Sequence, residues 1–252
     1  MAQKTMRQRP PGFLAGAAVY AVPAPRIFAP MPALAALLLD LDGTLVDSEP
    51  CHVRAHELFL ARQGMPCTTQ DLLENVGRGD RELYARLAER AGRTIDVAAW
   101  VQGKTDMLLE VYRDQGLAAQ PGATELIDEA KALGLTCMVV TSSERRVAAA
   151  ALAATGLAER LPMRICSEDS VRHKPHPEPY LLAALRLSLP SASCLVIEDS
   201  VSGVRAAVAA GMSAIGFLGA HGMVPAAALS AAGARRVIGS LRDLLPLADA
   251  IA

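Results

Sequence analysis

Short apolar runs alternate with alanine-rich helical patterns along most of the chain. The runs cover residues 34–39, 135–140, 163–166, 194–197 and 213–218, and each ends in polar residues. They lack the strict alternation of a strand with one wet face, so they predict strands that are covered on both faces. Strands of this kind between helices predict an α/β fold, with a parallel sheet between two helix layers.

One stretch departs from this alternation. Between residues 48 and 120 the apolar positions follow helical spacing, without a convincing strand. The expected helices cover residues 50–63, 69–75, 80–92 and 96–114. Turn-like sequences, DSEP before the stretch and AAQPG after it, mark its borders. The pattern predicts a helical insertion over 49–116, in a core domain built from 34–48 and 117–252.

The first 33 residues fit neither pattern. They combine prolines and arginines with an apolar stretch near Phe13 to Val22 that is too short to span a bilayer. Two interpretations are open: a signal peptide, or a disordered extension upstream of a natural start at Met31. We favour a disordered extension over 1–33, because five scattered cysteines without a C-x-x-C pair fit a reducing, cytoplasmic setting.

The composition excludes several classes of protein. Of the 252 residues, 52% are hydrophobic and 4% aromatic, and the formal net charge is −1. This is typical of a soluble globular protein without the basic clusters of a nucleic-acid-binding surface. No other segment has the length and apolar purity of a membrane helix. We therefore expect a cytoplasmic monomer or weak homodimer, without nucleic-acid or membrane partners.

Chemically active side chains follow the ends of the predicted strands. They are acids, hydroxyls and a lysine: Asp40, Asp42, Thr141, Ser142, Lys174, Glu198 and Asp199. In open parallel sheets ligands bind beyond the carboxyl ends of the strands, so these residues are expected to share one rim. Charged groups gathered at one edge need each other or a ligand to offset their desolvation.

The acids of this rim indicate Mg²⁺. The four carboxylates would form a hard, oxygen-lined pocket that suits Mg²⁺ and is poor for zinc or copper. A divalent cation and Lys174 would keep Asp40 ionised, so that its carboxylate is available as a nucleophile.

The same rim suits phosphoryl transfer. Asp42, two residues past the nucleophile in an extended segment, would protonate a leaving oxygen and then activate water. Phosphoryl transfer depends mostly on positioning and charge stabilisation. The donors to the phosphoryl oxygens would be the side chains of Thr141 and Lys174 and backbone N–H groups around Gly43 and Ser142.

Four motifs, in order, carry a resemblance to a known family. They are DLDGTLVDS (40–48), VVTSS (139–143), HKPHPEPY (173–180) and VIEDSVSGVRAAVAAGM (196–212). On these motifs the chain resembles the haloacid dehalogenase (HAD) superfamily phosphatases with an α-helical cap, in the subgroup of β-phosphoglucomutases and sugar phosphatases. The resemblance covers about residues 34 to 246, and it implies a Rossmann-like parallel sheet with an inserted helical cap.

The resemblance also implies a set of metal ligands. These are the side chain of Asp40, the backbone carbonyl of Asp42 and the side chain of Asp199. For Glu198 two roles stay open, a further ligand or a partner of the ligands. Thr141 also has a simpler role open to it, the cap of a helix that begins near Glu144.

The inserted helices would supply the residues that select the substrate, because a cap over the rim meets the rest of the substrate. The candidates are His52, Arg78, Asp80, Arg81 and Lys104, and we expect His52, Arg78 and Lys104 to bind substrate. For each of them the alternative is a solvated helix face. The resemblance places a histidine at the position of His52 in β-phosphoglucomutases and in many phosphatases.

The resemblance implies a phosphatase. We expect a Mg²⁺-dependent phosphomonoester hydrolase that acts on a small phosphorylated metabolite, a sugar or sugar-acid phosphate, through an aspartyl-phosphate at Asp40. The alternative is a β-phosphoglucomutase-like mutase, in which a sugar hydroxyl replaces the water. A non-catalytic binding module is more remote, because Asp40 and Asp42 are both intact, and a dehalogenase would not need the second aspartate.

Overall fold

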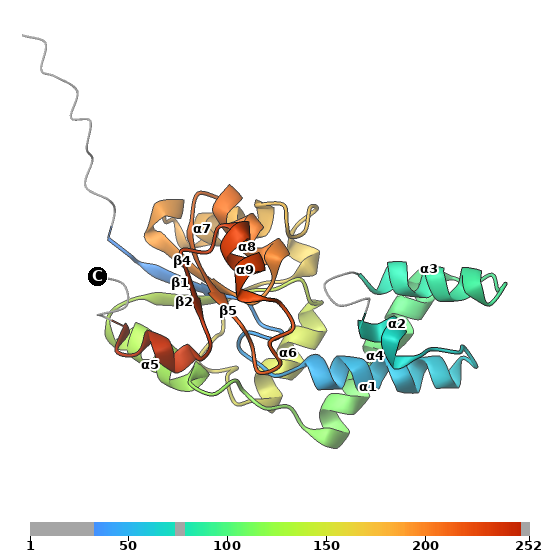
Figure 1. Ribbon diagram of the computed structural model, residues 1–252. Coiled ribbons are helices and arrows are strands. Elements are labelled where there is room, and N and C mark those ends of the chain that lie inside the picture. The colour runs from blue at the N-terminus through green and yellow to red at the C-terminus, as the bar shows by residue number, and fades with distance from the viewer. Residues whose placement is uncertain (1–32, 74–78, 248–252) are drawn as a thin grey trace, which may run out of the picture. The chain divides into compact units, whose positions relative to one another are not determined.

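Six parallel strands form one sheet in the part of the chain that the computed structural model describes, residues 33–73 and 79–247 (Figure 1). Their order is β3-β2-β1-β4-β5-β6. Their bounds are β1 Ala36–Leu39, β2 Thr136–Val140, β3 Arg164–Ile165, β4 Cys194–Glu198, β5 Ser213–Phe217 and β6 Arg236–Ile238. Leu39 is in register with Val139 of β2 and Ile197 of β4, so the three central strands end at one level. The predicted α/β fold is confirmed.

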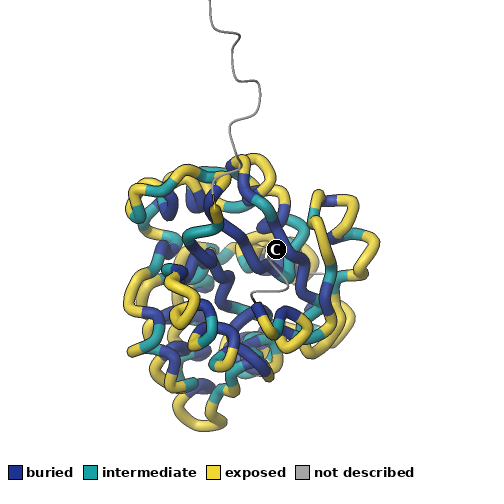
Figure 2. Tube along the Cα trace, turned by 90° about the vertical axis from the view of Figure 1, so that its left-hand side faces the viewer, coloured by how far each residue is buried: buried dark blue, intermediate teal, exposed yellow. Residues whose placement is uncertain are grey.

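Both faces of the sheet are covered, which explains the unbroken apolar runs. Leu37 and Leu39 belong to the hydrophobic cluster that includes α5 and α6, whereas Ala36 and Leu38 belong to the cluster that includes α7, α8 and α9. Successive side chains of a strand point to opposite faces, so both must be apolar here. The helices are α5 Ala123–Ala132, α6 Arg145–Ala154, α7 Glu178–Leu187, α8 Val201–Ala209 and α9 Ala226–Ala232. Figure 2 shows the buried strands inside and the exposed positions on the outer helices and loops.

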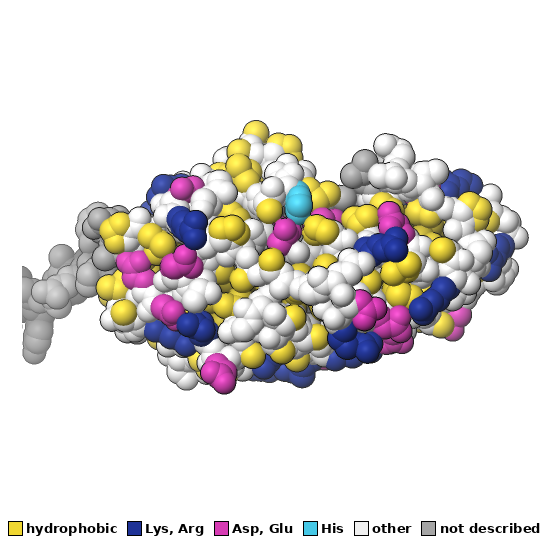
Figure 3. Space-filling model, turned by 90° about the horizontal axis from the view of Figure 1, so that it is seen from below, with side chains coloured by type: hydrophobic (Ala, Val, Ile, Leu, Met, Phe, Trp, Pro, Cys, Tyr) yellow, Lys and Arg dark blue, Asp and Glu magenta, His cyan; other side chains and the backbone are white. Residues whose placement is uncertain are grey.

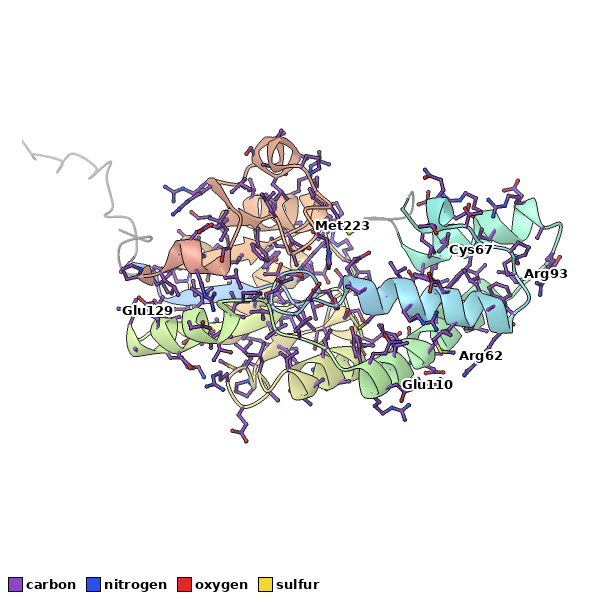
Figure 4. All side chains as sticks on the ribbon, turned by 60° about the horizontal axis from the view of Figure 1, so that its bottom comes forward. Arg62, Cys67, Arg93, Glu110, Glu129 and Met223 are labelled. Atoms are coloured by element: carbon purple, nitrogen blue, oxygen red, sulfur yellow. The ribbon has the colours of Figure 1, made fainter. Side chains whose placement is uncertain are left out.

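Four helices lie between the first two strands in sequence. They are α1 Glu49–Arg62, α2 Thr69–Leu73, α3 Asp80–Arg90 and α4 Val97–Gln115, called here the cap. The rings of Phe59, Tyr84 and Trp100, one from each of the three longer helices, lie with their centroids 5.6 to 5.8 Å apart. Arg62 of α1 and Glu110 of α4 form an exposed ion pair at 3.4 Å (Figure 4).

Two chain segments connect the cap to the sheet, and they are hydrogen bonded to each other. The amide of Asp47 donates to the carbonyl of Ala118, and the amide of Gln120 donates to the carbonyl of Leu45, both at 2.9 Å. The side-chain amide of Gln120 donates to the carbonyl of Gly43 at 3.2 Å. The connection between the cap and the sheet therefore lies beside the first motif.

One strand was not predicted from the sequence, and one open alternative, a helix cap at Thr141, is not found. β6 has three residues at the edge of the sheet, with Arg236 exposed, so its pattern carries no apolar run. Helix α6 begins one residue after Glu144, and the carboxylate of Glu168, rather than Thr141, accepts from its first amide. Thr141 therefore does not take the capping role that the sequence left open for it, because the helix begins too late for its side chain to reach.

Some predictions fall outside the described residues. These are the extension over 1–33, apart from residue 33, the end of the helix expected over 69–75, and Arg78. Among the described helices, none has the length and apolar content to cross a membrane. On the face that Figure 3 shows, basic and acidic side chains are interspersed and do not form a basic patch.

Candidate active site

The strand ends of β1 and β4 lie side by side at the place where the strand order reverses. From β1 the chain passes to β2 on one side, and β4 pairs with β1 on the other. The loops after such strands diverge and leave a crevice between them. A cavity of about 500 Å³ opens here, between the rim of the sheet and the cap, and its lining includes Asp40, Lys174, Asp199 and Lys104.

Lys174 is the centre of the charged groups on the rim. Its side chain is 4% exposed, and its ammonium donates to Asp40 Oδ1 and to Glu198 Oε1, both at 2.6 Å. A third hydrogen bond goes to the carbonyl of Val140 at 2.8 Å. All three ammonium protons are thus used, so the position of the lysine relative to Asp40 is fixed.

Glu198 is fully buried, and both of its carboxylate oxygens are occupied. Besides Lys174, Oε1 accepts from the hydroxyl of Tyr180 at 3.0 Å. Oε2 accepts from the amide and the hydroxyl of Ser200, at 3.1 and 2.9 Å. An added Cβ at Gly203 would overlap this carboxylate, so only glycine leaves room for it. These contacts fix the Glu198 carboxylate, and the fixed carboxylate in turn holds Lys174.

Asp199 is much less occupied. Among the described side chains it accepts one long hydrogen bond, from Thr44 Oγ1 at 3.4 Å. Its carboxylate lies against Gly43, which has a φ of 78° and no room for a Cβ on this side. A glycine adopts this left-handed backbone without strain, and it lets the main chain approach the acid closely.

The acids repel one another in this buried position. Burial raises the pKa of Asp40 to about 8; Glu198 and Asp42 add to the rise, and Lys174 opposes it. Burial and the charges of Asp40 and Glu198 raise the pKa of Asp199 well above its usual range. One lysine is therefore not enough to balance the carboxylates, and a further cation would favour their charged forms.

A metal ion fits these residues. One oxygen from each of Asp40, Glu198 and Asp199 lies within 4.8 Å of the others. A purely oxygen donor set suits a hard cation such as Mg²⁺. Since the oxygens of Glu198 already have partners, Asp40 and Asp199 are the side chains with capacity to bind it.

Asp42 has different surroundings. Its Oδ1 accepts from the hydroxyl of Ser48 at 2.7 Å, and its Oδ2 accepts from the hydroxyl of Ser143 at 2.5 Å. Burial alone would raise its pKa, but the imidazole of His52 and the two hydroxyls outweigh burial and hold the pKa well below its usual range. Asp42 is thus an ionised carboxylate with its orientation fixed by hydrogen bonds.

The hydroxyl and amide donors predicted for phosphate lie at the same cavity. Thr141 is buried at the end of β2, and its Oγ1 accepts from the amide of Ser143 at 3.0 Å. Ser142 and Gly43 also line the cavity. Of the cap residues, His52 and Lys104 line it as expected, while Arg78 is not described.

Several contacts at the site were not expected from the sequence. Ser143 and Tyr180 lie inside the second and third motifs, but a hydroxyl in a motif gave no signal of its partner. The stretch GFLGAHG (216–222) is different, because its place after a predicted strand lets it border the pocket; the lining includes His221 and, just beyond the stretch, Met223. Figure 4 shows Met223 at the side of the α/β part nearest the cap helices. Nε2 of His221 donates to Oδ1 of Asp47, in the connecting segment, at 2.8 Å.

A parallel sheet with an aspartate, a lysine and further acids at adjoining strand ends, under an inserted helical cap, is the architecture of an α/β enzyme. The chain belongs to the haloacid dehalogenase-like hydrolase family, whose model matches residues 34–211. The resemblance found in the four motifs and the enzyme class of a HAD-type hydrolase are thereby confirmed.

Relatives and solved structures agree with this assignment. The chain is 32% identical to a phosphoglycolate phosphatase of Yersinia pseudotuberculosis over 219 residues, 85% of this chain and 93% of the relative. It is 31% identical to the fructose-1-phosphate phosphatase YqaB of Escherichia coli over 183 residues, 72% of this chain and 95% of the relative. The structure of CbbY from Rhodobacter sphaeroides in complex with phosphate matches with a TM-score of 0.74 and 26% identity, over 84% of this chain and 96% of that one.

Proposed function

We propose that the protein is a Mg²⁺-dependent phosphatase that hydrolyses a small phosphoric monoester, a sugar or sugar-acid phosphate, through an aspartyl-phosphate at Asp40. The observation that carries the proposal is the position of Asp40, held by Lys174 at 2.6 Å in a cavity that also contains Asp42 and Asp199. Relatives named as phosphatases of phosphoglycolate and of fructose 1-phosphate support both parts of the substrate class.

In the first step Asp40 acts as the nucleophile. A carboxylate oxygen of Asp40 forms a bond to phosphorus, while the bond from phosphorus to the leaving oxygen breaks. This step requires the protonated form of Asp42, which gives its proton to that oxygen; the alcohol departs and Asp42 is left as the carboxylate that the second step uses. Lys174 keeps Asp40 in place and balances part of the phosphoryl charge, and Thr141 with the amides near Gly43 and Ser142 would bind the remaining oxygens.

In the second step Asp42 acts as the base. It takes a proton from water, whose oxygen attacks phosphorus, and the bond to Asp40 breaks with release of phosphate. The ionised Asp42 of the structure, with its hydrogen bonds from Ser48 and Ser143, is the form that this step requires. When bound by Asp40, Asp199 and the backbone near Asp42, Mg²⁺ would supply charge stabilisation for the transferring phosphoryl group.

The test is phosphate release from a panel of sugar and sugar-acid phosphates with Mg²⁺. We expect Asp40→Asn to lower kcat by at least about a thousandfold on any substrate that the wild type hydrolyses, because the nucleophile is lost. Asp106→Asn, which changes an exposed acid paired with Arg146, is the matched control and should keep wild-type turnover. Equal turnover in wild type and Asp40→Asn would rule out the mechanism.

The mutase alternative is tested on the same panel. Isomerisation of a sugar phosphate is measured beside phosphate release, with and without the matching bisphosphate. We expect release to be the faster process; isomerisation that outruns release would make the protein a mutase. A cytoplasmic location and a monomer or weak homodimer stay predictions from the sequence.

A further inference from the structure

A chain of polar contacts crosses the cap and ends at Asp42. Its central member is Lys104 of α4, whose side chain is 4% exposed. The Lys104 ammonium lies 2.9 Å from Nδ1 of His52 and 3.1 Å from Oδ2 of Asp80. Asp80 is the first residue of α3, and the proposed reaction gives it no role. The Asp80 side chain is 26% exposed and lines the cavity, so it is a candidate for a role at the site.

The contacts determine which nitrogen of His52 carries the proton. An ammonium group has protons to donate and no lone pair, so Nδ1 of His52 must accept from Lys104. A neutral imidazole then carries its proton on Nε2. This atom is buried without a hydrogen-bond partner among the described residues, and it lies 3.6 Å from Oδ1 of Asp42. The N–H of His52 is therefore directed toward the proposed acid and base.

Asp80 is held on its other side as well. Its Oδ1 lies 3.4 Å from Nε2 of His56, and Nδ1 of His56 lies 2.9 Å from the hydroxyl of Tyr84. One arrangement of protons satisfies both contacts: the hydroxyl of Tyr84 donates to Nδ1, and Nε2 donates to Asp80. Residues from α1, α3 and α4 thus fix Asp80, and Asp80 fixes Lys104.

We propose that Asp80 is a positioning residue for the reaction: it orients Lys104, which keeps His52 in the tautomer that presents its Nε2–H to Asp42 and to the leaving oxygen. Without the carboxylate, Lys104 has one partner fewer and His52 becomes free to carry its proton on Nδ1. The unprotonated Nε2 would then face Asp42 with a lone pair, which disfavours the ionised base of the second step. The kinetic part of this inference rests on the proposed function.

The direct test is the ¹⁵N spectrum of the imidazole of His52, recorded on the full chain at one pH and without substrate. His52→Gln assigns its signals. In the wild type we expect Nε2 to carry the proton and Nδ1 to be an acceptor, and in Asp80→Asn we expect a mixture of tautomers. This readout needs no turnover, so it tests the positioning role even if the panel yields no substrate.

Asp71→Asn is the matched control. Asp71 is a buried acid of the cap, paired with Arg90 at 2.6 Å and absent from the cavity lining. We expect Asp71→Asn to lower stability and leave the His52 spectrum and kcat unchanged. In Asp80→Asn we expect kcat to fall by about tenfold or more with KM nearly constant, since a fixed tautomer matters most during proton transfer.

Three results would overturn the inference: an unchanged His52 tautomer in Asp80→Asn, a changed tautomer with unchanged kcat, or a raised KM alone, which would make Asp80 a substrate contact. If Asp80→Asn does not fold, Lys104→Met removes the donor to Nδ1 directly. Lys104→Met should give the same mixture of His52 tautomers, and a wild-type spectrum in that variant would equally contradict the inference.

Discussion

Glu198 holds Lys174 in place from a position that has no contact with solvent. It is 0% exposed, and it accepts hydrogen bonds from Lys174, Tyr180 and Ser200. A buried carboxylate is tolerated when it is paired and fully hydrogen bonded, and leaving such a group unpaired costs several kcal/mol. At the scale of single residues, Asp40 is thus positioned by Lys174, and Lys174 by Glu198.

Gly203→Ala tests this packing. In a helix, alanine is normally more stable than glycine by about 0.5 to 1 kcal/mol. At Gly203 the added methyl group would overlap the Glu198 carboxylate, and such overpacking costs about 1 to 3 kcal/mol. We expect a net loss of stability in urea unfolding, together with a loss of kcat, because Glu198 must move away from Lys174.

Gly239→Ala is the control for this prediction. A Cβ at Gly239 would meet nothing within 4 Å, so its stability and kcat should stay close to those of the wild type. Wild-type stability in Gly203→Ala would show that Glu198 has room to move and that its packing does not fix Lys174.

At the scale of elements, the cap combines an apolar core with buried polar groups that its helices share. α1 and α4 approach closely at Gly103, where an added Cβ would lie 2.5 Å from the ring of Phe59. Near the cavity, His56 of α1 and Tyr84 of α3 add a hydrogen bond to the contact between their rings. A protonated imidazole has no lone pair for the Tyr84 hydroxyl, so this hydrogen bond between α1 and α3 depends on a neutral His56.

Acid should weaken this contact. Burial lowers the pKa of His56 below 6.5; Lys104 and His52 lower it further, and Asp80 opposes them. Between the folded pKa and 6.5 the unfolded chain binds more protons, so the stability from neutral His56 is present above pH 6.5 and is lost as pH falls below it, by at most about 1.4 kcal/mol per pH unit.

The measurement is the free energy of unfolding at pH 7.5 and pH 5.5. Carboxylates elsewhere contribute equally to wild type and His56→Gln, so the difference between the two proteins isolates the histidine. We expect His56→Gln to lose less stability on acidification than the wild type. An equal loss in both would show that His56 titrates alike in the folded and unfolded chains.

At the scale of the whole molecule, the sheet brings together residues that are 158 or more positions apart in sequence: Asp40 with Glu198 and Asp199. These carboxylates repel one another, and the repulsion destabilises the fold at the place where the proposed metal would bind. A ligand that binds only the folded chain stabilises it, by about 2.7 kcal/mol at a hundred times its Kd. For a chain of this size, each kcal/mol raises Tm by about 2 to 4 °C.

Mg²⁺ should therefore raise the Tm of the wild type by several degrees over the value in a chelator, with no such rise for Asp199→Asn. In the chelator we expect Asp199→Asn to melt at or above the wild type, because the substitution removes one repelling carboxylate. Differential scanning calorimetry measures both. A Tm of the wild type that does not respond to Mg²⁺ would speak against a metal at these acids.

The sheet was predictable because its strands are buried on both faces and so must be apolar throughout, as in Ala36–Leu39. The edge strand β6 was not, since one exposed arginine in three residues leaves no pattern. In the site, Asp40, Lys174 and Asp199 were predictable from their places after strands. The partners of Glu198 were not, because a hydrogen bond between Tyr180 and Glu198 depends on how α7 packs against the sheet.

By itself, the sequence determined the layers of the fold, the four motifs and the acids and lysine of the rim, because periodicity and strand ends are local properties of the chain. The tertiary structure decided which of these groups contact one another. Glu198 pairs with Lys174, Asp199 keeps the capacity to bind a cation, and Lys104 pairs with Asp80 and His52. These choices depend on distances between elements far apart in the chain, which packing sets and local pattern does not encode.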